Sequence, residues 1–130
     1  MNRQEFQVLA ETRLVEAQVL FRNDRFDGAY YLAGYVIECA LKACIAKRTR
    51  QDEFPDKEFA RKVWTHDLEK LLDATDIVIE GSESKLKWNV VKDWSENCRY
   101  QTHDAKKARD MLDAVSDVQH GVLQCLKRYW

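Results

Sequence analysis

A guanidinium and an imidazole flank the start of the last predicted helix, at Arg99 and His103, and Thr102 is the expected N-cap. Free backbone N–H groups at a helix start favour an anion, and a guanidinium holds a phosphate through two parallel hydrogen bonds. A neighbouring imidazole can take up or donate a proton. We therefore expect Arg99 and His103 to lie within reach of one phosphate as candidate catalytic residues, with Tyr100 and Thr102 as binding residues.

Glu38 is a second charged group in an unusual setting, because it lies in the most apolar stretch of the chain, Phe26–Lys47. An unpaired carboxylate inside a helix bundle is very costly. Lys42 follows four residues later on the same helix face, and the planar fork of Arg99 suits a buried carboxylate. We expect Glu38 to be paired with Arg99 or Lys42, which makes Glu38 and Lys42 candidate binding residues. In the alternative interpretation Arg99 serves only such a carboxylate, and His103 is an ordinary first-turn residue.

The other two histidines carry weaker signals. His66 precedes Asp67 at an expected helix start, and His120 lies beside Gly121 in the last predicted helix. We interpret both as structural or surface residues, and His66 stays open as a second candidate. No spacing of histidines, cysteines or carboxylates matches a metal motif, and the four glycines form no phosphate loop, so we expect no metal and no cofactor.

Helical periodicity covers most of the chain and predicts an all-α fold. Phe26–Lys47 is apolar on nearly every side, as a helix at the centre of a bundle must be. We expect one domain over residues 1–130, an up-and-down antiparallel bundle of four long helices plus a short one. The predicted helices are Asn2–Arg22, Phe26 to near Arg48, a short one from Thr65 to Asp73, Ser84–Cys98, and His103 to about Tyr129 with Val118 in its apolar stripe; Thr49–Lys62 is a predicted loop.

The composition limits the partners and the compartment. The formal net charge is −1, so no overall basic field drives nucleic-acid binding, and any such binding needs a local patch. The N-terminus shows no apolar signal core, and charges interrupt the longest apolar run, so we expect no membrane association. Four cysteines at apolar helical positions favour buried free thiols and a cytoplasmic location: Cys39, Cys44, Cys98 and Cys125.

Three segments, taken in order, resemble the HEPN domain (higher eukaryotes and prokaryotes nucleotide-binding). The first is RFDGAYYLAGY at Arg25–Tyr35, followed by ECALKA at Glu38–Ala43. The second is THDLEKLL at Thr65–Leu72, and the third is WSENCRY at Trp94–Tyr100. The resemblance covers roughly residues 5–128 and implies an up-and-down helical bundle that is often dimeric.

The same resemblance implies two kinds of function. Many members are metal-independent ribonucleases built around an Arg-x4–6-His motif; others bind nucleotides or RNA, or pair with a small nucleotidyltransferase in toxin–antitoxin and defence modules. Here Arg99 and His103 form Arg-x3-His, and Ala105 stands where one nucleotidyltransferase-paired subgroup has tyrosine. In the ribonuclease version His103 is the base and acid and Arg99 holds the phosphate.

We therefore expect a prokaryotic stress, defence or toxin–antitoxin protein that binds RNA and can cleave it without metal. The alternative is a non-catalytic interaction or nucleotide-binding module that pairs with a nucleotidyltransferase-type partner. A chain end of two large aromatic residues, Tyr129 and Trp130, suggests packing on a second copy. With the resemblance, it predicts a homodimer.

Overall fold

A computed structural model describes residues 1–49 and 57–130, and the described residues form helices and no strand. The predicted all-α class is confirmed, although the helices are shorter and more numerous than predicted. They are α1 (Arg3–Arg22), α2 (Phe26–Arg48), α3 (Lys57–Val63), α4 (Leu68–Thr75), α5 (Ser82–Val91), the 3₁₀ helix η1 (Glu96–Tyr100), α6 (Ala105–Ser116) and α7 (Val122–Lys127). The predicted loop Thr49–Lys62 is wrong over its last six residues, which belong to α3, and residues 50–56, which contain the proline, lie outside the described residues.

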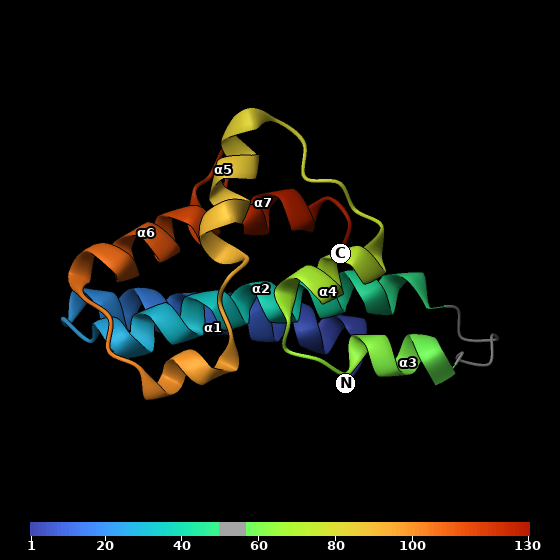
Figure 1. Cartoon of the computed structure of the whole chain (residues 1–130), viewed down its shortest axis with the longest axis horizontal. Helices are drawn as coiled ribbons and strands as arrows, with labels where there is room; N and C mark the ends of the chain where they lie inside the picture. Colours follow the sequence, from blue (N-terminus) through green and yellow to red (C-terminus); the bar gives the residue numbers. More distant parts are fainter. Residues whose placement is uncertain (50–56) are drawn as a thin grey trace.

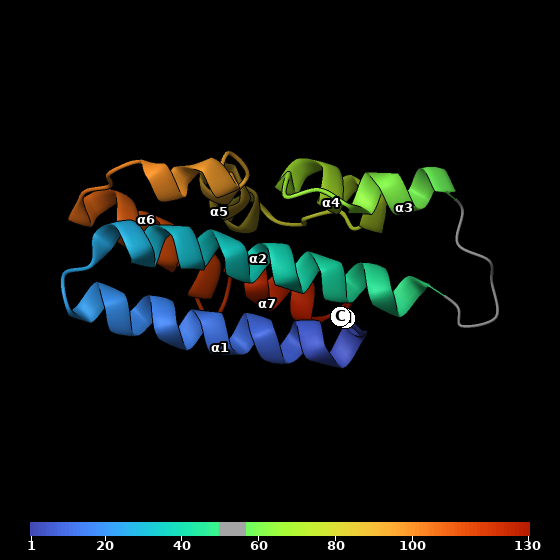
Figure 2. The ribbon, with the colours of Figure 1, turned by 90° about the horizontal axis from the view of Figure 1, so that it is seen from below.

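Helix α2 forms the centre of the molecule. It pairs with α1 as a long antiparallel hairpin, and the shorter helices pack over it (Figure 1, Figure 2). Twelve of its 23 residues are buried, which confirms the predicted central helix. By length and composition α2 could also cross a membrane, but 67% of its apolar stretch is buried inside the protein, as in the core helix of a bundle.

Helix α1 has two apolar faces. It begins with a capping box, in which the Asn2 side chain accepts from the Glu5 backbone N–H at 2.9 Å and the Glu5 carboxylate accepts from the Asn2 N–H at 2.7 Å. The inner face, which includes Ala10 and Ala17, is buried. The opposite face carries three exposed valines: Val8, Val15 and Val19.

The prediction of one continuous last helix is wrong, because a turn at 117–121 separates α6 from α7. The Asp117 carboxylate accepts the His120 backbone N–H at 2.8 Å, and the Asp117 carbonyl accepts the Gly121 N–H at 3.0 Å. A Cβ at Gly121 would lie 2.5 Å from that carbonyl oxygen, so the turn requires glycine. Val118 is therefore 81% exposed, where the apolar stripe predicted burial.

The predicted helix Ser84–Cys98 is also too long. Helix α5 ends at Val91, and Trp94 then reaches the core from the following loop. A Cβ at Gly34 would lie 2.2 Å from the Trp94 ring, so α2 needs a glycine where the indole packs. After this loop the chain forms η1, which also packs against α2.

Both predicted threonine N-caps are wrong by two residues. Helix α4 is capped by Asp67, whose carboxylate accepts the Lys70 N–H at 3.1 Å, and α6 is capped by Asp104, which accepts the Lys107 N–H at 2.8 Å. An aspartate at this position also interacts favourably with the positive end of the helix. The two helices therefore start after a His-Asp dipeptide.

Candidate functional site

One side of α2 carries two tyrosines together with the predicted carboxylate and cation. Tyr31, Tyr35, Glu38 and Lys42 are spaced four, three and four residues apart, so they share one helix face over roughly 16 Å. We call these four residues the α2 face. The 3₁₀ helix η1 packs near the N-terminal half of α2, and α3 and α4 lie over its C-terminal half (Figure 2).

Glu38 lies at the C-terminal end of the α2 face and is buried, with 1% of the residue exposed. Its Oε1 accepts from Lys42 Nζ at 3.2 Å and is also hydrogen-bonded to His66 Nδ1. The expected Glu38–Lys42 pair is confirmed, and His66 rather than Arg99 is the second partner. Glu38 Oε2 is buried and accepts no hydrogen bond from the described residues.

The His66 ring is at the surface, with 53% of its side chain exposed. The backbone around it is held at two points, because Thr65 Oγ1 accepts the Asp67 N–H at 3.1 Å and Asp67 caps α4. Sequence reasoning kept His66 only as a secondary candidate. Its position before a helix start was the one available signal, because Glu38 is 28 residues away in the chain.

Arg99 and Tyr100 lie at the surface on η1, near the N-terminal end of the α2 face. The guanidinium carbon lies 4.9 Å from the centre of the Tyr100 ring, and that tyrosine is 76% exposed. Hydrogen bonding raises the pKa of Arg99 above its ordinary value, with Tyr100 as the main partner and Tyr31 as a smaller contributor. Among the described residues Arg99 forms no ion pair with a carboxylate, so the guanidinium is available to a ligand.

His103 is packed inside the protein, with 8% of the residue exposed. Its ring stacks on Tyr30 with 3.9 Å between the centroids, and its Nε2 lies 3.3 Å from the Cys98 carbonyl oxygen. The His103 backbone N–H donates to the Asp27 carboxylate. The structure therefore places Arg99, Tyr100 and Thr102 in exposed positions and His103 in a buried one, and it does not bring the two candidate catalytic side chains to one surface.

The four cysteines are buried and free, as predicted. Burial raises the pKa of the Cys39 thiol to about 12, and those of Cys44 and Cys98 to about 11. A thiol with such a pKa stays protonated near neutral pH, so these three residues are poor nucleophiles. The described residues contain no group of three or more histidine, cysteine or carboxylate side chains that could hold a metal ion.

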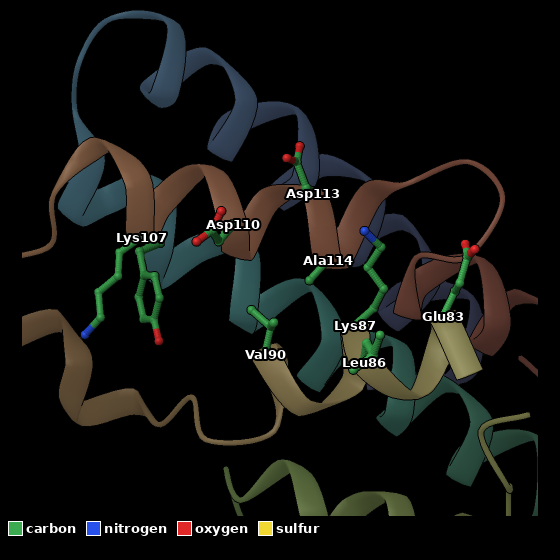
Figure 3. Close-up of a pocket in the computed structure, with 9 residues that line it drawn as sticks. Glu83, Leu86, Lys87, Val90, Lys107, Asp110, Asp113 and Ala114 are labelled. Carbon is green, nitrogen blue, oxygen red and sulfur yellow. The ribbon is translucent and has the colours of Figure 1, made fainter. Parts of the chain in front are cut away.

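A groove lies between α5 and α6, apart from the α2 face (Figure 3). Apolar Leu86 and Val90 contribute to its lining and are 65% and 44% exposed. Three carboxylates and two lysines also line it: Glu83, Asp110, Asp113, Lys87 and Lys107. Acids outnumber cations there, so this groove is poorly suited to a phosphate.

The fold and the α2 face define a small helical domain with two tyrosines, a carboxylate and a lysine along one face of its central helix. A protein-family model described as the HEPN domain matches residues 8–128, nearly the whole chain. The chain therefore belongs to the HEPN family, a family of nucleotide- and RNA-related modules, as its three segments predicted. Comparison with curated proteins and with solved structures gave no match.

Proposed function

We propose that this protein binds single-stranded RNA or a nucleotide at Arg99, Tyr100 and the α2 face. The observation that carries the proposal is the Arg99 guanidinium, 4.9 Å above the exposed Tyr100 ring and unpaired with any described carboxylate. A guanidinium in this position can bind a phosphate, and an exposed aromatic ring can stack on a base. In this proposal Arg99 and Tyr100 contact the ligand, and the Thr102 hydroxyl is an additional donor.

The α2 face extends this surface toward a second cationic group. Tyr31 and Tyr35 have nearly parallel rings 6.3 Å apart, and Lys42 lies beyond them with 24% of its side chain exposed. Proteins that bind single strands combine cations with aromatic residues in this way. Because the net charge of the chain is −1, such a local surface is what RNA binding requires.

Fluorescence anisotropy with a labelled single-stranded oligoribonucleotide at a stated low salt concentration tests the proposal. Arg99→Ala and Tyr100→Ala should each weaken binding about tenfold or more, because a charged hydrogen bond and a stacked base are each worth about 1–3 kcal/mol. Arg128→Ala removes an exposed arginine from the end of α7 and is the matched control. Equal affinities for all four proteins would rule out this binding surface.

Metal-independent cleavage of the bound RNA by Arg99 and His103 is the sharper form of the proposal. The burial of His103 favours a binding role over this form, because a general base must reach the ribose hydroxyl. The test is cleavage of single-stranded RNA in EDTA, in which Arg99→Ala and His103→Ala are compared with the wild type. Activity that is lost in both folded variants would support the shared site.

A non-catalytic interaction module is the second candidate function, and the exposed Leu86 and Val90 in the α5–α6 groove favour it. The proposed partner is a nucleotidyltransferase-type protein of the same prokaryotic stress, defence or toxin–antitoxin module, in the cytoplasm. Co-expression with a nucleotidyltransferase encoded by a neighbouring gene tests this candidate. Loss of co-purification in Leu86→Glu but not in Val118→Glu, which also changes an exposed apolar residue, would support it.

We also propose that the protein is a homodimer in which the outer valines of α1 pack against a second copy. Trp130 is not free for this role, because it packs on the core of its own chain and its carbonyl oxygen accepts from Arg3 at 2.8 Å. An antiparallel register that places Val8 opposite Val19 of the partner subunit also places Val15 opposite Thr12 of the partner subunit.

Analytical ultracentrifugation at micromolar concentration should give twice the 15.3 kDa of one chain. Val15→Glu should shift the protein toward the monomer, because it places a charge in the proposed contact. Val118→Glu is the matched control, since Val118 is also exposed but lies outside α1. A wild-type protein that sediments as a monomer throughout this range contradicts the dimer.

A further inference from the structure

The described part of the chain contains two histidine–carboxylate pairs, and they differ in which partner is buried. In the pair of His120 with Glu83, Nε2 lies 3.0 Å from the carboxylate and both side chains are well exposed, at 41% and 66%. In the pair of His66 with Glu38, the carboxylate is 1% exposed and the imidazole is 53% exposed. A buried carboxylate thus holds a surface histidine, an arrangement that the surface pair does not have.

The contact also determines which ring nitrogen of His66 is free. Because Glu38 Oε1 contacts Nδ1, that nitrogen carries the proton in the neutral ring and Nε2 carries the lone pair. A carboxylate bound to Nδ1–H sets the tautomer and orientation of a catalytic histidine in the same way and stabilises the imidazolium that forms. His66 therefore presents a proton acceptor at the surface, at the end of the α2 face.

We propose that His66 is a general acid–base residue for cleavage of single-stranded RNA, with Glu38 as its positioning residue and Lys42 as a phosphate contact. This inference rests on the proposed RNA binding along the α2 face. Lys42 and His66 meet at the same carboxylate oxygen, so an ammonium group and an imidazole lie side by side. The remaining oxygen of Glu38 is buried and accepts no hydrogen bond from residues 1–49 or 57–130, and it can stabilise added positive charge on this pair.

The reaction that suits this group is transfer of the RNA phosphate to its own 2′-oxygen. His66 Nε2 takes the proton of the 2′-hydroxyl, the 2′-oxygen forms a bond to phosphorus, and the bond from phosphorus to the 5′-oxygen breaks. The imidazolium returns the proton to the 5′-oxygen, which leaves as a hydroxyl, while Lys42 holds the non-bridging oxygens. The products are a 2′,3′-cyclic phosphate and a 5′-hydroxyl end, and no other reactant is consumed.

The surroundings of His66 hold it ready for this step. The hydrogen bond from the Asp67 N–H to Thr65 Oγ1, at 3.1 Å, and the Asp67 cap of α4 hold the backbone on its C-terminal side. On the other side of the ring, α2 is the most buried helix and holds Glu38 in place. A catalytic side chain is more effective when rigid elements position it, because less reorganisation is needed in the reaction.

The decisive experiment is cleavage of a labelled single-stranded RNA in EDTA by wild type, His66→Ala and His120→Ala, with an all-deoxy strand of the same sequence as the uncleavable control. We expect a 2′,3′-cyclic phosphate product, a loss of about 10²–10⁴-fold in His66→Ala, and little change in His120→Ala. Exogenous imidazole should restore part of the His66→Ala activity. A wild type without cleavage, or a folded His66→Ala with full activity, overturns the inference.

The role of Glu38 needs a measurement that does not depend on activity. The ¹⁵N chemical shifts of the His66 ring should show the Nδ1–H tautomer in the wild type and a mixture of tautomers in Glu38→Leu, whose side chain has no acceptor. An unchanged tautomer in Glu38→Leu would remove the positioning role. RNA that binds the wild type but is not cleaved would overturn this inference and leave the proposed binding function intact, whereas a complete failure to bind would remove both.

Discussion

The two His-Asp helix starts of this protein, His66-Asp67 before α4 and His103-Asp104 before α6, have the same local sequence and opposite environments. In both, the aspartate caps the helix by accepting an N–H three residues later, at 3.1 and 2.8 Å. The His66 ring is 53% exposed and bonded to a buried carboxylate, whereas the His103 residue is 8% exposed and stacked on Tyr30. A local motif can thus determine where a helix begins without determining what its histidine does.

The difference comes from the residues of α2 that pack against each helix start. We call these two segments the α4 joint (His66-Asp67) and the α6 joint (His103-Asp104). The α6 joint lies against the N-terminal part of α2, where Asp27 binds the His103 backbone and Tyr30 covers the ring. The α4 joint lies against the middle of α2, where Glu38 points toward His66. One joint therefore contributes an imidazole to the core, and the other contributes one to the surface.

The largest change in stability should come from a substitution in α2, because both joints pack against this helix. Ile37→Ala on α2 removes a fully buried side chain, 0% exposed, and should lower the free energy of unfolding by about 2–5 kcal/mol. Chemical denaturation followed by circular dichroism measures it. Val118→Ala, at an 81% exposed position in the turn after α6, is the control and should cost far less; equal costs would contradict the assignment of α2 as the core helix.

Raising the pH should destabilise the protein near both joints through their buried thiols. Burial raises the pKa of Cys39, next to Glu38, to about 12 and that of Cys98, at the His103 joint, to about 11, from 9.0. The folded state keeps these protons above pH 9 while the unfolded state loses them, so stability is complete below pH 9 and falls as the pH rises toward 11–12. Denaturation curves should show a loss on the order of 2 kcal/mol between about pH 8.5 and 10. A flat profile would contradict the burial of the thiols.

The two histidines should differ in how much each stabilises the fold. His103→Ala removes a stacked, buried ring and should cost about 1–3 kcal/mol. His66→Ala removes an exposed ring and leaves Lys42 to pair with Glu38, so we expect a cost below about 1 kcal/mol. Thermal unfolding of the two variants side by side measures the difference, and equal costs would mean that both histidines have the same structural role.

The smallest expected difference is between the two caps. Asp67→Ala and Asp104→Ala should each cost about 1 kcal/mol, because each leaves a first-turn N–H without its partner. The two values should be similar, since the local geometry of the caps is the same. A much larger cost for Asp67→Ala would show that this residue also holds the His66 loop through its backbone, and backbone hydrogen exchange in α4 would detect the loosened segment.

Patterns within one stretch of sequence predicted much of the fold and part of the site. The apolar composition of Phe26–Lys47 predicted the buried central helix α2, and the four-residue spacing predicted the pair of Glu38 with Lys42. The three segments predicted the HEPN family, which the match over residues 8–128 confirms. These features depend on helix geometry or on residues close in sequence, so the sequence alone was enough to find them.

Tertiary structure decided the rest. The turn that requires Gly121, the indole of Trp94 against Gly34, and the contact of His66 with Glu38 join backbone segments whose approach no local periodicity encodes. The same is true of the ring of Tyr30, which stacks on the buried His103 while Arg99 lies exposed. The sequence alone therefore determined that the chain forms a helical HEPN domain with a charged pair inside it. Only the packing of the joints on α2 decided which histidine faces solvent, because that depends on which side chains from distant turns come into contact.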